Sequence, residues 1–171
     1  MTQQRSDDPE PPGPPSPDLW RIGARPLERR LDLKAEDGVL AMLARYANCA
    51  DRVPGSAGWG SCFTADTVVR IFGPTRNTPL VLTGCDVVAR AFDEAEDPVP
   101  HLHVVTNVII ESDGDGGGAS LESYFVRVDI LDDTSRIGSF GRYHDHAVRC
   151  ADGQWRMDRR DIRISARLST R

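Results

Sequence analysis

The most regular alternation of side chains in this chain lies between Pro100 and Ile110, and it predicts a β-strand. A strand with one apolar face usually carries charged residues on the face that meets water. Here the second face carries two imidazoles and an amide among apolar residues, which is typical of the wall of a small-molecule pocket. The pattern also fits histidines that are simply half-buried and hydrogen-bonded. The two faces are His101, His103, Val105, Asn107 and Ile109, and Leu102, Val104, Thr106, Val108 and Ile110.

A helical spacing of apolar residues precedes this strand. Over residues 35–50 they recur at three- and four-residue intervals, and Glu36 and Asp37 add acidic groups to the first turn, where the helix dipole favours them. A turn over 51–55 ends this helix, a short helix follows around 59–63, and another helix spans about 83–94. The apolar positions of the first helix are Val39, Leu40, Leu43, Tyr46, Ala47 and Ala50.

The other elements are predicted to be strands. Helices followed by a run of antiparallel strands predict an α+β fold rather than an α/β fold. Long, twisted strands that follow an N-terminal helix favour a curved antiparallel sheet wrapped around it, and the hollow between sheet and helix is the expected site. Turn residues at 113–118, 132–133 and 152–153 separate the last four strands. The predicted strands are 67–72, 80–82, 100–111, 119–130, 137–150 and 154–166.

The beginning of the chain differs from the rest in composition. Residues 7–17 are rich in proline, which neither a helix nor an internal strand accepts. Few apolar side chains are present there to offset the entropy of ordering. We therefore expect residues 1–33 to be a disordered Pro-rich tail and residues 34–167 to form the folded domain.

Composition and charge narrow the classes of partner. The net charge of −5 over 171 residues argues against nucleic acid or an anionic membrane as the main partner. No apolar run approaches the length of a membrane span and no signal peptide opens the chain, so we expect a cytoplasmic protein. The cysteines form no CxxC pair and are expected to be reduced thiols, although a disulfide stays open because sequence does not reveal spatial neighbours. They are Cys49, Cys62, Cys85 and Cys150.

Three groups of polar side chains are expected to face the hollow. The end of the first helix presents Tyr46 and Asp51, and the central strand presents His101 and His103. An aspartate beside a histidine fixes the ring tautomer and raises the basicity of the other nitrogen, and a tyrosine can donate to an oxygen that gains charge. Together these groups would support proton removal next to a carbonyl without a cofactor. The later strands contribute Tyr124, Arg142, His144 and Arg160.

Simpler interpretations of the same residues stay open. Asp51 fits a turn residue at a helix end, Tyr46 fits the core, and Tyr124 fits ordinary sheet packing. Arg159, Arg160 and Arg163 also fit a solvated sheet edge.

Two HxH pairs, His101 with His103 and His144 with His146, raise the question of a metal site, because residues two apart on a strand share a face. A cupin-like site would add a glutamate soon after the first pair. Glu111 lies eight residues beyond His103, which is too far for that spacing, and the early helices do not suit a cupin. We therefore expect no metal.

Several segments, taken in their order and spacing, resemble SnoaL-like domains of the nuclear transport factor 2-like superfamily. They are residues 43–51, 59–66, 103–107, 141–145 and 152–160. The resemblance covers about residues 35–165. It implies a cone-shaped α+β barrel with a deep apolar pocket, and it is strongest toward the dehydratase-like branch, which includes scytalone dehydratase and bile-acid dehydratase.

The resemblance also implies roles for individual residues. In the dehydratase-like branch an Asp at the end of the first helix pairs with a His on the central strand, which matches Asp51 and His103. Tyr46 and Arg160 match a tyrosine and an arginine of the bile-acid enzymes. Tyr124 stands where the dehydratases carry a His or an Asp, and this departure leaves the group that protonates the leaving hydroxide open between His144 and Arg142.

The resulting hypothesis is a cofactor-independent lyase, isomerase or cyclase that acts on a hydrophobic, carbonyl-bearing small molecule of polyketide or steroid type. His103 would be the base, Asp51 would orient it, and Tyr46 would stabilise the enolate oxygen. One alternative is a non-catalytic subunit whose pocket is filled by side chains. The other is an epoxide hydrolase, which would require Asp129 and Asp145 to face inward. The resemblance further implies a homodimer. The residues expected to position substrate are Tyr124, Asn107, Arg160, His144, Arg142 and His101.

Overall fold

The computed structural model describes residues 33–51, 58–74, 78–95, 99–114 and 116–167. The predicted Pro-rich tail therefore lies outside the described residues, apart from Leu33, and so does most of the turn predicted over 51–55. Within the described part, no helix is both long enough and apolar enough to pass through a bilayer.

The elements follow the predicted order closely. Strand β1 begins four residues earlier than the predicted 67–72, because residues 63–66 also have extended backbone. The other boundaries lie within about two residues of the prediction, which is the usual uncertainty of helix and strand ends. The elements are α1 (Leu33–Ala50), η2 (Trp59–Ser61), β1 (Phe63–Phe72), β2 (Leu80–Thr83), α2 (Cys85–Asp93), β3 (His101–Ser112), β4 (Gly118–Ile130), β5 (Ser135–Arg149) and β6 (Trp155–Arg167).

The six strands form one sheet in the order β2-β1-β6-β5-β4-β3. Strands β3 to β6 form the predicted antiparallel meander. The expectation of a wholly antiparallel sheet is corrected at one place, because β1 pairs with β6 in parallel. Between β1 and β6 the chain forms α2 and the rest of the meander, so these two strands are far apart in sequence but adjacent in space. The fold class is α+β, as predicted.

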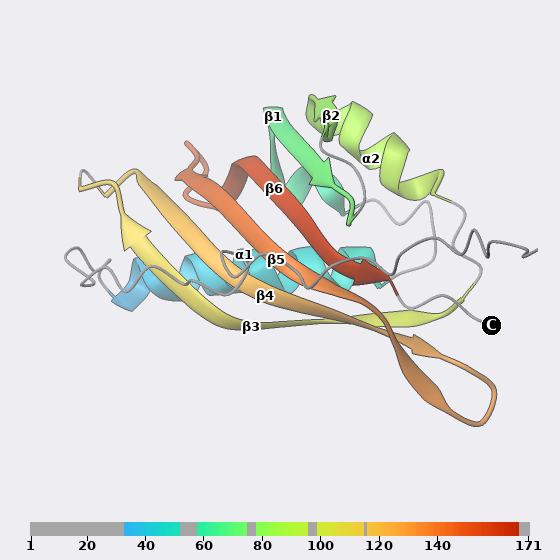
Figure 1. The fold of residues 1–171 in the computed structure, drawn as a ribbon. Coiled ribbons are helices and arrows are strands. Elements are labelled where there is room, and N and C mark those ends of the chain that lie inside the picture. Colours follow the sequence, from blue (N-terminus) through green and yellow to red (C-terminus); the bar gives the residue numbers. More distant parts are fainter. Residues whose placement is uncertain (1–32, 52–57, 75–77, 96–98, 115, 168–171) are drawn as a thin grey trace, which may run out of the picture.

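Helix α1 lies across one face of the curved sheet, and α2 lies beside β1 and β2 (Figure 1). The buried residues of α1 are Val39, Met42, Leu43 and Tyr46, a spacing that places them on one side of a helix. Leu40, predicted to be a core position, is 39% exposed because it lies off this stripe. The helix face toward the sheet therefore closes the core and carries Tyr46 into it.

Strand β3 does not keep the alternation that its sequence predicts. Asn107 has φ 54°, a left-handed conformation, and the register with β4 shifts between Thr106 and Ile109. Beyond this bulge Val108 and Ile110 pack against the core on the side of Val105. The prediction that one face runs unbroken from residue 101 to 109 is wrong, because the bulge exchanges the faces at Asn107.

Candidate functional site

The carboxylate of Asp51 and the imidazole of His103 meet at the C-terminal end of α1. Asp51 Oδ1 lies 2.8 Å from His103 Nδ1 and 2.7 Å from the backbone nitrogen of the same residue. Since an ionised carboxylate only accepts, the hydrogen is assigned to Nδ1, and Nε2 keeps its lone pair. No described residue is hydrogen-bonded to this Nε2. The arrangement leaves one nitrogen of an oriented imidazole available as a base.

The surroundings of His103 favour its neutral form. Its side chain is 14% exposed and that of Asp51 is 19% exposed. Burial lowers the pKa of His103, while the hydrogen bond and the charge of Asp51 act in the opposite direction. Electrostatic interactions with His101 and Arg127 lower the pKa of His103 further. A neutral base at neutral pH follows from this balance.

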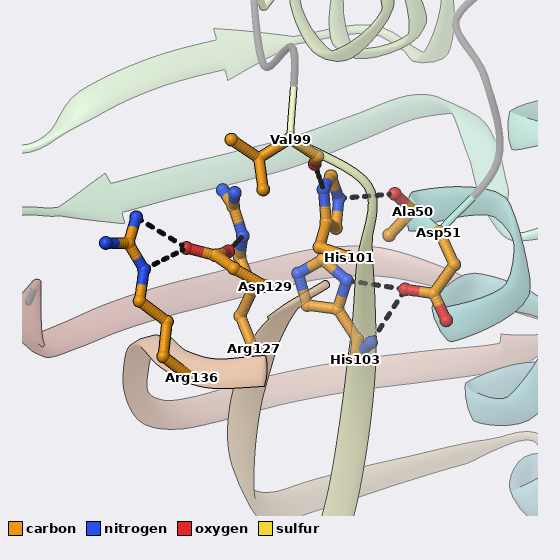
Figure 2. Close-up of polar contacts among 8 residues, drawn as sticks. All are labelled: Ala50, Asp51, Val99, His101, His103, Arg127, Asp129 and Arg136. Carbon is orange, nitrogen blue, oxygen red and sulfur yellow. Dashed lines mark hydrogen bonds and ion pairs between the residues drawn. The ribbon is translucent and has the colours of Figure 1, made fainter. Parts of the chain in front are cut away.

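His101 lies beside His103 but is turned toward the backbone. Its Nδ1 is 2.8 Å from the carbonyl oxygen of Val99, and its Nε2 is 3.1 Å from that of Ala50 (Figure 2). A neutral imidazole has one N–H and can donate to only one of these carbonyls, whereas the protonated ring can donate to both. Each ring nitrogen lies within hydrogen-bond distance of a backbone carbonyl, and His101 links β3 to the end of α1. The expected contact between His101 and substrate does not fit this orientation of the ring.

Next to the two histidines is an ion-pair cluster of Arg127, Asp129 and Arg136 (Figure 2). Arg127 Nε lies 2.8 Å from Asp129 Oδ1, and two nitrogens of Arg136 lie 3.4 Å from Asp129 Oδ2. The two arginines were not among the predicted site residues. Arg127 and Asp129 alternate in phase with the core residue Phe125, so strand periodicity would have placed them on the inner face.

Deeper between α1 and the sheet, Arg160 is fully buried and bound to Asp145. Its Nε and Nη2 each donate to a carboxylate oxygen at 2.8 Å. The guanidinium carbon also lies 3.7 Å from the ring centre of Tyr46 and 4.0 Å from that of Tyr143, which is cation–π geometry. Arg160 is therefore not part of a solvated edge, because β6 lies between β1 and β5.

The same interior is filled by aromatic rings. Tyr143 stacks on Phe125 with ring centres 4.5 Å apart and meets Tyr46 edge-on at 5.8 Å. Burial raises the pKa of Tyr46, so its hydroxyl stays protonated at neutral pH. Where the resemblance implied a deep apolar pocket, these three rings pack against one another between α1 and strands β4 and β5.

Four of the predicted site residues lie on the opposite face of the sheet. Phe125 and Tyr143 point toward α1, so their strand neighbours point away from it. With Ile109 and Glu122, these residues line a shallow outer groove with room for about one water molecule. These four residues were expected to face the hollow. Strand alternation, and at Asn107 the bulge, directs their side chains to the other face. They are Asn107, Tyr124, Arg142 and His144.

Neither HxH pair is arranged for a metal. His101 and His103 share a face, but both nitrogens of His101 contact backbone carbonyls and Nδ1 of His103 contacts Asp51, so the pair leaves only His103 Nε2. His146 contacts Asp158 at 2.6 Å and Asp113 at 2.7 Å. Among the described residues, no group of three or more His, Cys, Asp or Glu side chains could hold a metal ion.

A family model described as the SnoaL-like domain matches residues 32–161, which is most of the chain. The chain belongs to the SnoaL-like domain family. No curated protein matches it. The dyad of Asp51 and His103 lies within the part of this SnoaL-like chain that the family model covers.

Solved structures with the same fold differ in their named functions. A protein of Novosphingobium aromaticivorans provisionally named a scytalone dehydratase is 21% identical, with a TM-score of 0.64 over 81% of this chain and 91% of that one. The β subunit of a provisionally named aromatic-ring-hydroxylating dioxygenase of the same organism is 18% identical, with a TM-score of 0.63 over 80% and 93%. An NTF2-like protein with a cystatin-like fold, also from that organism, is 17% identical, with a TM-score of 0.64 over 77% and 82%. At these identities the likeness establishes the NTF2-like fold.

Proposed function

We propose that this SnoaL-like protein is a cofactor-independent lyase, isomerase or cyclase that removes a proton next to a carbonyl of a hydrophobic small molecule. A polyketide-like or steroid-like substrate of secondary metabolism suits this chemistry. The observation that carries the proposal is the 2.8 Å contact between Asp51 Oδ1 and His103 Nδ1. It leaves Nε2 of a half-buried, neutral imidazole without a partner among the described residues.

In the proposed reaction, His103 Nε2 takes the proton from the carbon next to the carbonyl. The electrons of the C–H bond move into the carbonyl, whose oxygen becomes an enolate. Asp51 stabilises the imidazolium that forms, because it already accepts the hydrogen of Nδ1. The imidazolium then returns the proton, either to a departing hydroxide, which gives elimination, or to another carbon, which gives isomerisation.

Tyr46 and Arg160 are the proposed partners of the substrate oxygen. The Tyr46 hydroxyl is protonated at neutral pH and can donate a hydrogen bond to a developing oxyanion. Arg160 Nη1 is buried and has no hydrogen-bond partner among the described residues. Because aromatic rings fill the interior around both groups, the proposal requires Tyr46 or Tyr143 to move when substrate enters.

Proton abstraction can be tested before the substrate is known. A panel of bicyclic and tricyclic ketones is incubated with the protein in D₂O, and deuterium entry next to the carbonyl is followed by ¹H NMR. The wild type should exchange at least one ketone faster than buffer does. His103→Asn should lower that rate roughly a hundred- to ten-thousand-fold, because a positioned base contributes about this factor.

Asp51→Asn should lower the exchange rate as well, because the amide does not stabilise the imidazolium. Asp152→Asn is the matched control, since Asp152 is an exposed carboxylate paired with Arg156 at the β5–β6 turn. Circular dichroism checks that each variant is folded. Wild-type exchange in His103→Asn, or an equal loss in Asp152→Asn, contradicts the assignment of His103 as the base.

A non-catalytic subunit is the second candidate, and the filled interior favours it. The Arg160–Asp145 ion pair and the rings of Tyr46, Tyr143 and Phe125 pack as a stable core would. A solved structure with this fold is named as the β subunit of a dioxygenase, which supports a role as a subunit. Epoxide hydrolysis has one supporting observation, since Asp129 and Asp145 are buried on the inner face, but both are held by arginines. If no ketone exchanges faster with wild type than with buffer, the subunit function is favoured.

A further inference from the structure

The last turn of α1 and the segment leading into β1 are joined by two cysteines. Cys49 belongs to α1, and Cys62 immediately precedes β1. Their Sγ atoms are 3.9 Å apart, although the residues are 13 positions apart in sequence. The described residues contain no second contact between cysteine sulfurs, and all four cysteines are free thiols.

We propose that Cys49 and Cys62 form a reversible dithiol–disulfide pair that a peroxide oxidises. A disulfide requires the sulfurs to approach to about 2.0 Å, so the gap to be closed is about 1.9 Å. Rotation about the side-chain torsions of both cysteines and a small shift of the helix end can share this movement. The contact spans two elements, so the bond would fasten the end of α1 to the start of β1.

The two sulfurs have different roles in the proposed oxidation. Cys49 is partly exposed, whereas Cys62 is fully buried, so we assign Cys49 as the cysteine that meets the oxidant. Burial raises the pKa of Cys62 to about 12, with a further increase from the neighbouring Cys49. Cys62 is therefore protonated at neutral pH and does not react first.

The chemistry balances with hydrogen peroxide as the oxidant. The thiolate sulfur of Cys49 attacks one peroxide oxygen, the O–O bond breaks, and Cys49 becomes a sulfenic acid as hydroxide leaves. The Cys62 sulfur then attacks the Cys49 sulfur, the S–O bond breaks, and the departing hydroxide takes the thiol proton as water. Each pair of thiols loses two hydrogens and reduces one peroxide to two waters.

The pair lies close to the proposed base. Asp51 follows Cys49 by two residues, and its carboxylate orients His103 at 2.8 Å. Because positioning within about an ångström matters for catalysis, closing the disulfide should change the exchange rate of the ketone assay and dithiothreitol should restore it. This consequence rests on the proposed function, whereas the disulfide itself does not.

The test is thiol mapping of the full chain after treatment with hydrogen peroxide. The oxidised protein is denatured, alkylated, digested with trypsin and analysed by mass spectrometry without reduction. Cleavage after Arg45, Arg52 and Arg70 places the two cysteines on the separate peptides 46–52 and 53–70. The expected product is one cross-linked species of these two peptides that is lost on treatment with dithiothreitol.

Three variants make the result specific. Cys49→Ser and Cys62→Ala should each abolish the cross-linked species, and the half-buried Cys49 site keeps the test valid if the buried Cys62 site does not tolerate change. Cys150→Ser is the matched control and should leave the cross-link unchanged. A sulfinic acid on Cys49 with no cross-link, or a disulfide that joins other cysteines, overturns the proposal. Inactivity of wild type in the ketone assay contradicts the proposed function and leaves the thiol mapping as an independent result.

Discussion

At the scale of residues, Asp51 and His103 show what a sequence pattern can and cannot provide. Their positions, at a helix end and on an alternating strand, predicted that both face one hollow. The specific pairing of Asp51 with His103, 52 residues apart, was predicted by the resemblance to SnoaL-like domains. The role of His101 could not be read in the same way. Its position is equivalent in the strand pattern, but its ring nitrogens meet two backbone carbonyls whose location depends on how α1 ends.

His146 gives a prediction for stability against pH. Burial alone would lower its pKa, but hydrogen bonds to Asp113 and Asp158 outweigh burial and raise the pKa above 6.5. A raised folded-state pKa contributes stability that is fully present below pH 6.5 and is lost as pH rises through the folded-state pKa. His146→Asn should therefore destabilise the protein more at low pH than at high pH.

Urea denaturation of wild type and His146→Asn from about pH 5.5 to about pH 9 measures the loss of stability at each pH. This range covers the titration of a histidine. His144→Asn serves as the control. His144 lies on the same strand, but its one acidic contact, with the exposed Glu122, is longer, at 3.6 Å. A destabilisation by His146→Asn that grows as pH rises would contradict the expected sign.

At the scale of elements, helix and strand positions were predictable because periodicity and turn residues are local signals. The faces of β3 were not, because a bulge changes the direction of every later side chain and depends on the pairing with β4. The parallel pairing of β1 with β6 is likewise a non-local feature. The bulge explains why Asn107 does not face the expected hollow, whereas Tyr124, Arg142 and His144 lie on the outer face because they alternate with Phe125 and Tyr143.

The bulge makes a specific prediction at Asn107. Its positive φ is tolerated by asparagine and glycine, and is strained for β-branched residues. Asn107→Val should lower the free energy of unfolding by roughly 1–2 kcal/mol, since that is the approximate cost of the left-handed conformation. Asn107→Gly should change it by less. Chemical denaturation of both variants checks this, and equal stabilities would mean that the backbone at Asn107 is not constrained.

At the scale of the whole molecule, the outer face of the sheet carries an exposed apolar patch near the start of β3. Leu102 and Val104 of β3 and Ile137 of β5 are 50%, 49% and 45% exposed. Leu102 of β3 and Ile137 of β5 both pair with Val128 of β4, the strand between them, so these residues lie on the face directed away from α1. Exposed apolar patches of this kind mark interaction sites. This face fits the homodimer that we expect from the family resemblance.

The expected homodimer can be measured by analytical ultracentrifugation. Val104→Arg should shift wild-type dimer to monomer, because a charge in the centre of an apolar interface is desolvated without a partner. Val87→Arg is the matched control, since Val87 is 42% exposed and lies on α2, away from this face. A monomeric wild type, or a dimer that survives Val104→Arg, contradicts this use of the outer face.

The interior is the other feature that only the complete structure reveals. Sequence periodicity placed Tyr46 in the core, but Arg160 was assigned to the substrate or to a sheet edge. Its burial depends on Asp145, one strand away, and on two aromatic rings that cover its faces. A charge can be this deep only when it is paired, and pairing across strands is not visible in a local pattern.

The proposed function requires that Asp51 holds His103 in the form of a base, with the hydrogen on Nδ1 and the lone pair on Nε2. The most direct measurement is a pH titration of the His103 ring by ¹⁵N NMR, which reports both the tautomer and the pKa. We predict the Nδ1–H tautomer at neutral pH and a midpoint below 6.5, because burial outweighs the raising effect of Asp51. Asp51→Asn should lower the midpoint further. An Nε2–H tautomer, or a midpoint above 6.5, would contradict the account.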